Sequence, residues 1–336
     1  MSKEETKTDL ARRNLIIMIA AFAAVYIIWG STYLAIKYAI ETIPSFLMAG
    51  VRFLVAGGIL YTFARVTGNY EKPKLVHWRT SFIVGTLLLG IGNGGVVIAE
   101  HYISSSLTAL LIATMPFWMV LLGWMFMGSG KPNYKVALGL FIGFAGVALL
   151  ITGRSVETSD GSGDGWLFGL VCILVAEIGW AFGSLYGAKA PTAKSFVQAA
   201  GMQMLAGGLV LVVAGMATGE WAALNVAAIS TNSWLALLYL IFFGAIIAYT
   251  AYSWLLKNVS PAAVSTYAYV NPAIAVCLGW AIAGESLTGQ MLIGAVVIVA
   301  SVALITLQKS GKKTVIEDEI SDANLGVAKT RATYST

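Results

Sequence analysis

Ten apolar runs of about 20 residues limit what this chain can fold into. They lie at about 15–36, 45–66, 78–99, 105–127, 134–152, 166–188, 195–217, 233–256, 262–284 and 288–308. A helix of about 20 apolar residues spans the roughly 30 Å hydrocarbon layer of a bilayer. The runs lack the period-2 alternation of membrane-barrel strands, and a helix satisfies its own backbone hydrogen bonds in lipid. The sequence therefore predicts an all-α polytopic membrane protein with ten transmembrane helices.

The charged residues support this class and predict an orientation. Only 11% of the residues are charged, against about 25% in an ordinary soluble domain. Of the 21 Lys and Arg residues, Lys37 and Arg154 fall in odd-numbered connections and Arg52 inside a run, while the others lie in the tails and even-numbered connections. The positive-inside bias predicts that both termini are cytoplasmic. This placement accounts for the net charge of +5, so no nucleic-acid partner is expected.

The two halves of the chain resemble each other. "AGVRFLVAGGIL" from Ala49 matches "AGMQMLAGGLVL" from Ala200, a shift of 151 residues. Shifts of 151 or 156 superpose further landmarks: Trp29 on Trp180, Trp78 on Trp234, and Pro116 on Pro272. Each half holds five runs, and because five is odd, the second half must enter the membrane from the opposite side. We therefore expect two inverted five-helix repeats, a design that lets a transporter rock about a central site; an inverted-repeat channel is the alternative.

This symmetry predicts the domain organisation. A cytoplasmic N-terminal tail, 1–14, precedes the first repeat, 15–152. A periplasmic linker, 153–165, leads to the second repeat, 166–308. The tail 309–336 is polar, mixed in charge and without a periodic apolar face, which is typical of disorder.

Several motifs carry a family resemblance. They are "YIIWGSTYLAI" from Tyr26, "GNGGVVIAEH" from Gly92, and "VSPAAVSTYAYVNPAIAVCLGWAIAGES" from Val259 to Ser286. With these motifs the chain resembles the EamA-type proteins of the drug/metabolite transporter superfamily, up to about Gln308. The resemblance implies ten helices in two EamA repeats, an inner-membrane location and export of small metabolites. The superfamily carries amino acids, other amphipathic metabolites and drugs, so the fold does not name the cargo.

The sequence departs from the family pattern at two points. The first half reads Gly128-Ser129 where the family often has a Gly-Glu pair matching Gly284-Glu285. Glu285 is therefore expected to be a loop or helix-cap acid. Glu177 matches no motif of the resemblance, so its role is argued from its position.

Glu177 lies about eleven residues into the run 166–188, which at 1.5 Å per residue is roughly 16 Å deep. Ionisable groups at that depth are functional-site candidates. We expect Glu177 to face a central cavity, and as a protonated acid it could couple export to proton entry. The alternatives are a hydrogen bond between helices or an ion pair with Arg52.

Arg52 is the basic residue that lies well inside a run. A guanidinium there could hold a substrate carboxylate through two hydrogen bonds, or could brace the bundle by bonding to carbonyl groups. Its repeat equivalent, Gln203, is neutral. The two half-sites would therefore be chemically unequal.

Other polar and aromatic residues near the repeat centre complete the expected cavity: Trp29, Ser31, Tyr33, Asn93, Trp180, Ser184, Tyr267 and Asn271. Aromatic faces suit an amphipathic or cationic cargo, and ordinary packing or an interfacial belt is the alternative. Glu100 and His101 read as a gate or rim pair. No metal is expected, because His77, the other histidine, belongs to the predicted cytoplasmic side and no ligand cluster completes a site.

The leading functional prediction is a secondary exporter that works by alternating access, driven by protons or by the substrate's own gradient. No phosphate-binding loop of the Walker type occurs, so neither ATP hydrolysis nor any cofactor is expected. A facilitative uniporter or channel and an importer of the same fold remain alternatives. An intramembrane enzyme is a remote one, because no Ser/His pair or paired acids occur at mid-depth. The expected partners are a small-molecule substrate, the lipid bilayer and candidate coupling protons, in a monomer or homodimer.

Overall fold

The computed structural model describes residues 3–128, 131, 134–152, 163–259, 264 and 267–301, and within these ranges every regular element is a helix. Seven helices are long and apolar enough to cross a membrane: Leu15–Ile40, Ser45–Val66, Leu75–Ala99, Ser105–Phe126, Gly165–Lys189, Phe196–Ala217 and Thr231–Asn258. The prediction of a helical polytopic membrane protein is thereby confirmed. The predicted linker 153–165 falls mostly, and the tail 309–336 wholly, outside the described residues.

The chain begins with α1 (Lys3–Ile40) and α2 (Ser45–Val66). The third span combines α3 (Leu75–Gly85), a π-helical segment Thr86–Asn93 and α4 (Gly94–Ala99), and the fourth combines α5 (Ser105–Ile112) with α6 (Met115–Phe126). Then follow α7 (Tyr134–Thr152), α8 (Gly163–Lys189), α9 (Phe196–Ala217) and the short α10 (Glu220–Ala223). The next span joins α11 (Thr231–Tyr239), a second π-helical segment Leu240–Tyr249 and α12 (Thr250–Asn258). Last come α14 (Tyr267–Ala283) and a shorter helix, Gly289–Ser301; with α7, these two lie in the three remaining apolar runs.

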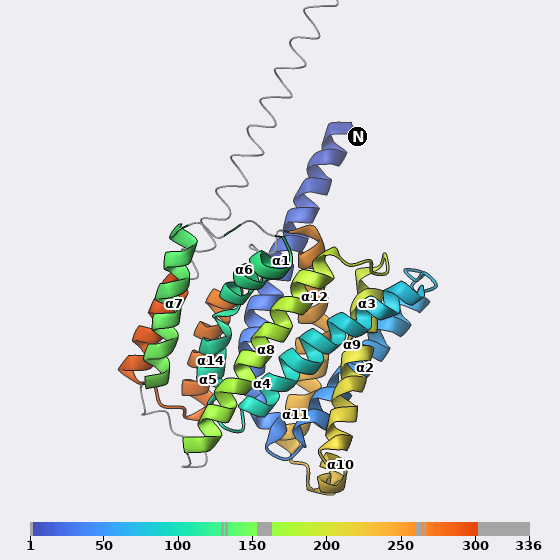
Figure 1. Cartoon of the computed structure of the whole chain (residues 1–336). Coiled ribbons are helices and arrows are strands. Elements are labelled where there is room, and N and C mark those ends of the chain that lie inside the picture. The colour runs from blue at the N-terminus through green and yellow to red at the C-terminus, as the bar shows by residue number, and fades with distance from the viewer. Residues whose placement is uncertain are drawn as a thin grey trace, which may run out of the picture.

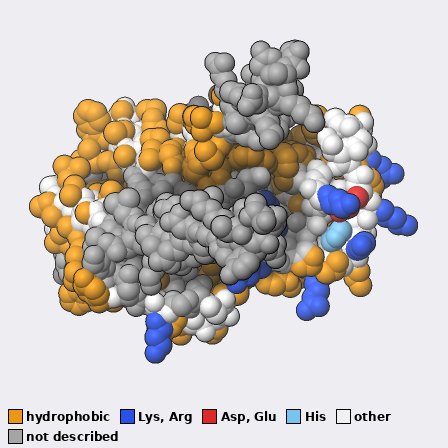
Figure 2. All heavy atoms as spheres, turned by 90° about the horizontal axis from the view of Figure 1, so that it is seen from above, with side chains coloured by type: hydrophobic (Ala, Val, Ile, Leu, Met, Phe, Trp, Pro, Cys, Tyr) orange, Lys and Arg blue, Asp and Glu red, His pale blue; other side chains and the backbone are white. Residues whose placement is uncertain are grey.

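The helices form one bundle (Figure 1). The N-terminus of α1 lies at the same end as the α2–α3 connection, while α10 lies at the other end. Viewed from above, Lys and Arg side chains gather on the N-terminal face (Figure 2). We call this face the basic end and the other the opposite end. Around the sides, large apolar side chains such as Phe63, Val213 and Leu235 are exposed, as expected for surfaces that contact lipid.

Glycines bring α2 and α9 into backbone contact. A Cβ atom added at Gly57 would lie 2.9 Å from the carbonyl oxygen of Gly201, and one added at Gly208 would lie 3.0 Å from that of Gly50. Small residues of this kind let membrane helices approach closely. The pairing of Gly50 with Gly208 and of Gly57 with Gly201 makes the helices antiparallel. A shift of 151 residues moves Gly50 onto Gly201 and Gly57 onto Gly208, so the contact maps onto itself.

The backbone repeats its irregular features at the same offsets. The described residues with positive φ are all glycines just past helix ends, and they form two pairs: Gly68 (75°) with Gly219 (79°), and Gly128 (68°) with Gly284 (66°). Glycine adopts this left-handed conformation without steric cost. The pairs are offset by 151 and 156 residues. The π-helical segment Thr86–Asn93 also overlaps Leu240–Tyr249 at an offset of 156.

Candidate substrate-binding cavity

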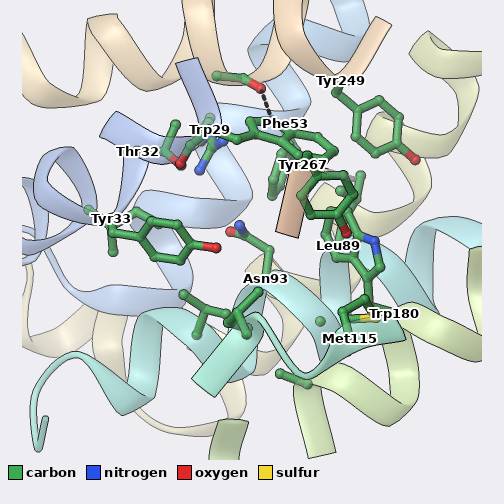
Figure 3. A pocket seen from close by; sticks show the side chains of 17 residues that line it. Trp29, Thr32, Tyr33, Phe53, Leu89, Asn93, Met115, Trp180, Tyr249 and Tyr267 are labelled. Carbon is green, nitrogen blue, oxygen red and sulfur yellow. Dashed lines mark hydrogen bonds between the residues drawn. The ribbon is translucent and has the colours of Figure 1, made fainter. Parts of the chain in front are cut away.

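A cavity with an empty volume of about 650 Å³ lies where the two halves of the chain meet. Its walls come from α1, α2, both π-helical segments, α4, α5, α6, α8 and α14. Six of the predicted site residues line it: Trp29, Tyr33, Arg52, Asn93, Trp180 and Tyr267. In the close-up, the Tyr33 hydroxyl and the Asn93 amide point into the same space (Figure 3).

Aromatic rings close one side of this cavity. Trp29 and Trp180, which are equivalent positions of the two halves, meet edge to face with ring centroids 5.5 Å apart. Tyr252 and Tyr267 pack on Trp29 at 4.9 and 5.4 Å. Trp29 Nε1 donates to the carbonyl oxygen of Gly244 at 3.2 Å, and this bond fixes the ring (Figure 3).

A second cavity, with an empty volume of about 1110 Å³, lies at the basic end. Its lining includes Lys194 from the α8–α9 connection and Lys257 from the end of α12. Tyr249 lines both cavities, and its hydroxyl donates to Gln203 Oε1 at 2.7 Å. Gln203 lines the second cavity, and Tyr249 lies between the two spaces.

Three predicted residues tie helices together and do not appear in the lining of the central cavity. Ser184 Oγ lies 2.8 Å from the Tyr252 hydroxyl. Ser31 Oγ donates to the carbonyl oxygen of Ile28 at 2.7 Å and lies 2.6 Å from the Tyr239 hydroxyl. The Asn271 amide nitrogen, turned toward α1, lies 2.9 Å from the carbonyl oxygen of Tyr26.

Arg52 lines the central cavity with little of its surface exposed (3%). Its Nε donates to the carbonyl oxygen of Leu240 at 3.2 Å, and its guanidinium lies over the Phe53 ring, 4.7 Å from the centroid. Its Nη1 is buried and has no hydrogen-bond partner. Among the described residues, no carboxylate forms an ion pair with Arg52.

Glu177 is buried in α8 beside the cavity, but it is not among the lining residues. Its carboxyl faces the start of α6, where Trp118 Nε1 donates to Oε2 at 2.9 Å. Thr114 Oγ1 lies 2.8 Å from each carboxyl oxygen and also 2.8 Å from the carbonyl oxygen of Leu111. These contacts join α8 to α6.

At the opposite end, Glu285 forms a cluster with Lys37, Ser105 and Ser106, which we call the Glu285 cluster. Glu285 Oε1 accepts from Lys37 Nζ at 3.0 Å, from Ser105 N at 3.1 Å and from Ser105 Oγ at 2.7 Å. Its Oε2 accepts from the backbone N–H and the hydroxyl of Ser106. Burial alone would raise the pKa of Glu285, but the bonds from Ser106, Ser105 and Lys37 hold it below the ordinary value of 4.5. Glu285 thus caps α5, as the sequence predicted for it.

Glu100 and His101 have separate environments. Both carboxyl oxygens of Glu100 are buried without a hydrogen-bond partner. Burial raises the pKa of Glu100 well above its ordinary value; the charge of Glu285 adds to this and that of Lys37 opposes it. His101 Nε2 lies 2.5 Å from Ser45 Oγ, at the start of α2. The described residues contain no group of three His, Cys, Asp or Glu side chains that could hold a metal ion.

Thr32, which could supply a hydroxyl beside Ser31, lines the central cavity. Sequence reasoning missed Tyr249 and Tyr252. Tyr249 lines the central cavity, while Tyr252 packs against its tryptophans. The two tyrosines lie three residues apart in one apolar run, and neither carries a charge that would mark it at mid-depth.

Comparison with known proteins identifies the family. The EamA-like transporter family matches residues 15–152 and 167–307. The chain is 40% identical over 317 residues to the uncharacterized inner membrane transporter YedA of Escherichia coli (strain K12), covering 93% of this chain and 98% of YedA. It is 24% identical to the uncharacterized transporter YoaV of Bacillus subtilis (strain 168), covering 86% of this chain and 97% of YoaV.

A solved crystal structure shares the fold with a TM-score of 0.61 at 18% sequence identity, covering 88% of this chain and 97% of that one. The structural likeness bears on the fold alone, while the family match covers most of the chain and agrees with its membrane-spanning helices. The chain belongs to the EamA-like transporter family and is a membrane transporter.

Proposed function

We propose that this chain is a secondary transporter of the inner membrane that exports small amino-acid-like or amphipathic metabolites by alternating access. Ten spans, formed by the seven long helices with α7, α14 and Gly289–Ser301, would make two inverted five-helix repeats. Both termini would be cytoplasmic, so the basic end would face the cytoplasm.

The observation that carries this proposal is the position of the central cavity on the boundary between the halves. Trp29 and Trp180 occupy equivalent repeat positions and meet in its wall. The contact between α2 and α9, which maps onto itself under the repeat shift, supports an axis about which the halves could rock. A cavity shared by two inverted halves can open first to one side and then to the other.

The closures on either side of the cavity favour a carrier over a channel. Tyr249, hydrogen-bonded to Gln203, stands between the central and the basic-end cavities. At the opposite end, the Glu285 cluster joins α1 and α5 to the segment after α14. A carrier needs a barrier on each side of its site, and opening the opposite end would require the bonds of Glu285 to break.

Proton coupling is proposed for Glu177. A hydroxyl carries one hydrogen, so Thr114 cannot donate to the Leu111 carbonyl and to both carboxyl oxygens at once. A protonated Glu177 would donate to Thr114, which would then donate to Leu111, while Trp118 donates to the other oxygen. These contacts suit a neutral acid, and rocking of α6 against α8 would remove them and release the proton. Glu100, with two unpartnered buried oxygens, is the competing candidate.

Transport in proteoliposomes of the purified full chain tests the proposal. A panel of labelled amino acids and amphipathic metabolites is offered with and without an imposed pH gradient. We expect saturable movement that Trp180→Ala abolishes, while Trp280→Ala, a change at a 61% exposed ring, leaves it intact. Movement without saturation or counterflow would indicate a channel. Equal loss of transport in both variants would contradict the assignment of the central cavity as the binding site.

The same vesicles separate the coupling candidates. Dependence on the pH gradient should disappear in Glu177→Gln and persist in Glu100→Gln. If only Glu100→Gln loses the dependence on the pH gradient, Glu100, at the opposite end, is the proton site. Exchange that ignores the gradient in the wild type would indicate a facilitative carrier, and vectorial uptake into right-side-out membrane vesicles would indicate an importer.

A further inference from the structure

We propose that the cargo of the central cavity is an amphipathic monocarboxylate, bound through its carboxylate to Arg52. The inference rests on the proposed function in one respect, namely that this cavity is where cargo binds. It goes beyond that function by fixing the charge of the cargo as a single negative one.

The unpaired state of the Arg52 guanidinium is the first argument. A buried cation without a counter-charge is destabilising, yet Arg52 is nearly fully buried and its Nη1 has no partner. The Leu240 carbonyl oxygen takes Nε but supplies only a partial negative charge. A ligand carboxylate would supply both the missing acceptor and the missing charge, and the planar fork of arginine suits a two-oxygen acceptor.

The lining of the cavity limits the charge of the ligand. Arg52 is the one charged residue among the described residues that line it. Glu177 and Glu100, the nearest candidates for attracting a cation, are not part of that lining. A cationic cargo would therefore meet Arg52 with no compensating acid, and a dianion would leave one charge without a counter-charge in the lining. One guanidinium matches one carboxylate.

The remaining surface of the cavity fits an apolar body. Phe53, Leu89, Met115 and Trp180 contribute apolar or aromatic groups to it, and Figure 3 shows their side chains around the same space. Asn93 Oδ1, buried and without a partner, offers a place for one hydrogen-bond donor of the ligand.

Ligand binding to the full-length protein in detergent tests this charge rule. The probes are 3-phenylpropanoate, its neutral amide 3-phenylpropanamide and the cation 3-phenylpropylamine, which share one body and differ in the polar group. Binding is followed by tryptophan fluorescence, because Trp29 and Trp180 form the wall of the cavity. We expect the acid to bind at least tenfold more tightly than the amide, and the amine more weakly than both.

Variants assign the preference to Arg52. Arg52→Gln should remove the tenfold preference for the acid, and Arg52→Lys should keep part of it. Arg65→Gln, on the same helix but at the basic end beside Tyr70, should leave it unchanged. If Arg52→Gln does not fold, the wild-type ranking of the three probes decides the question.

The results separate this inference from the proposed function. Equal binding of acid and amide, tighter binding of the amine, or no binding of any probe at millimolar concentration overturns the monocarboxylate assignment. Transport of another class of compound would then leave the carrier proposal standing. Tight binding of the acid without any transport of it would uphold the assignment and count against the carrier.

Discussion

Two adjacent glycines of α2 allow a direct measurement of how closely α2 and α9 pack. A Cβ added at Gly57 would lie 2.9 Å from three atoms of α9: the Gly201 carbonyl oxygen, the Leu205 amide nitrogen and Met204 Cβ. That is 0.5 Å inside the 3.4 Å at which ordinary contact begins, and two of the three atoms are backbone. A Cβ added at Gly58 would meet nothing within 4 Å.

We therefore compare Gly57→Ala with Gly58→Ala. Both changes gain about 1 kcal/mol of helix propensity, so this gain cancels between them. The Gly57 change also pays about 1–3 kcal/mol of overpacking. We expect Gly58→Ala to be more stable than Gly57→Ala by about 1–3 kcal/mol in the free energy of unfolding.

Titration with SDS in mixed micelles, followed by tryptophan fluorescence, measures this difference. Gly201→Ala supplies a check from the other helix, because its Cβ would lie 2.9 Å from the Tyr61 amide nitrogen and 3.1 Å from the Gly57 carbonyl oxygen. It should behave as Gly57→Ala does. Equal stabilities of the Gly57 and Gly58 variants would refute the close backbone contact, and with it the argument that the α2–α9 contact maps onto itself.

Further predictions concern the bonds around the cavity. Because the folded-state pKa of Glu285 is held below 4.5, its stabilising contribution is complete above pH 4.5 and is lost as the pH falls through the lower folded value; the melting temperature should thus fall more steeply on acidification in wild type than in Glu285→Gln. Trp118→Phe removes a donor to Glu177 and should lower the free energy of unfolding by about 1 kcal/mol, measured in the same SDS titration. Tyr249→Phe leaves Gln203 Oε1 without its donor and should cost about 1–3 kcal/mol; because Tyr249 lines both cavities, this variant should also leak its substrate faster down a gradient in vesicles.

The class of fold could be predicted because lipid imposes a simple rule. Apolar length alone located the seven long spans, and the structure shifts their ends by a few residues. The first span continues to Ile40 past the predicted end at 36, because Lys37 neutralises its charge against Glu285, a residue 248 positions later in the chain. A pattern confined to one helix cannot report such a partner.

The π-helical segments had no sequence signal. Both lie in apolar stretches, Thr86–Asn93 and Leu240–Tyr249, whose residues also suit an ordinary α-helix. The glycines near the first allow close approach: a Cβ at Gly92 would lie 2.9 Å from Trp180 Cε3, and one at Gly95 would lie 2.8 Å from the Cys172 carbonyl oxygen. What the sequence could not give was the helix that approaches them, α8.

The sequence predicts how far along its helix a site residue lies, but not which face of the helix it occupies. Counting residues places Glu177 near mid-membrane, but each residue turns an α-helix by about 100°. Ala176 and Trp180, four residues apart on one face of α8, line the cavity. Glu177 is one step further round, toward Thr114 and Trp118. A depth argument holds for every residue of a turn, so it could not tell these faces apart.

The two closures of the proposed carrier are chemically unequal, and the sequence shows why. At the repeat offsets, Lys37 corresponds to Ala188 and Glu285 to Ser129, so the repeat equivalents of the ion pair carry no charge. Breaking the Glu285 cluster requires an ionised carboxylate to leave its donors and be solvated again, which is sensitive to pH and salt. The Tyr249–Gln203 contact at the other barrier is between neutral groups and lacks that sensitivity. In the proposed carrier, the closure at the opposite end would therefore respond to pH and salt, while the closure at the basic end would not.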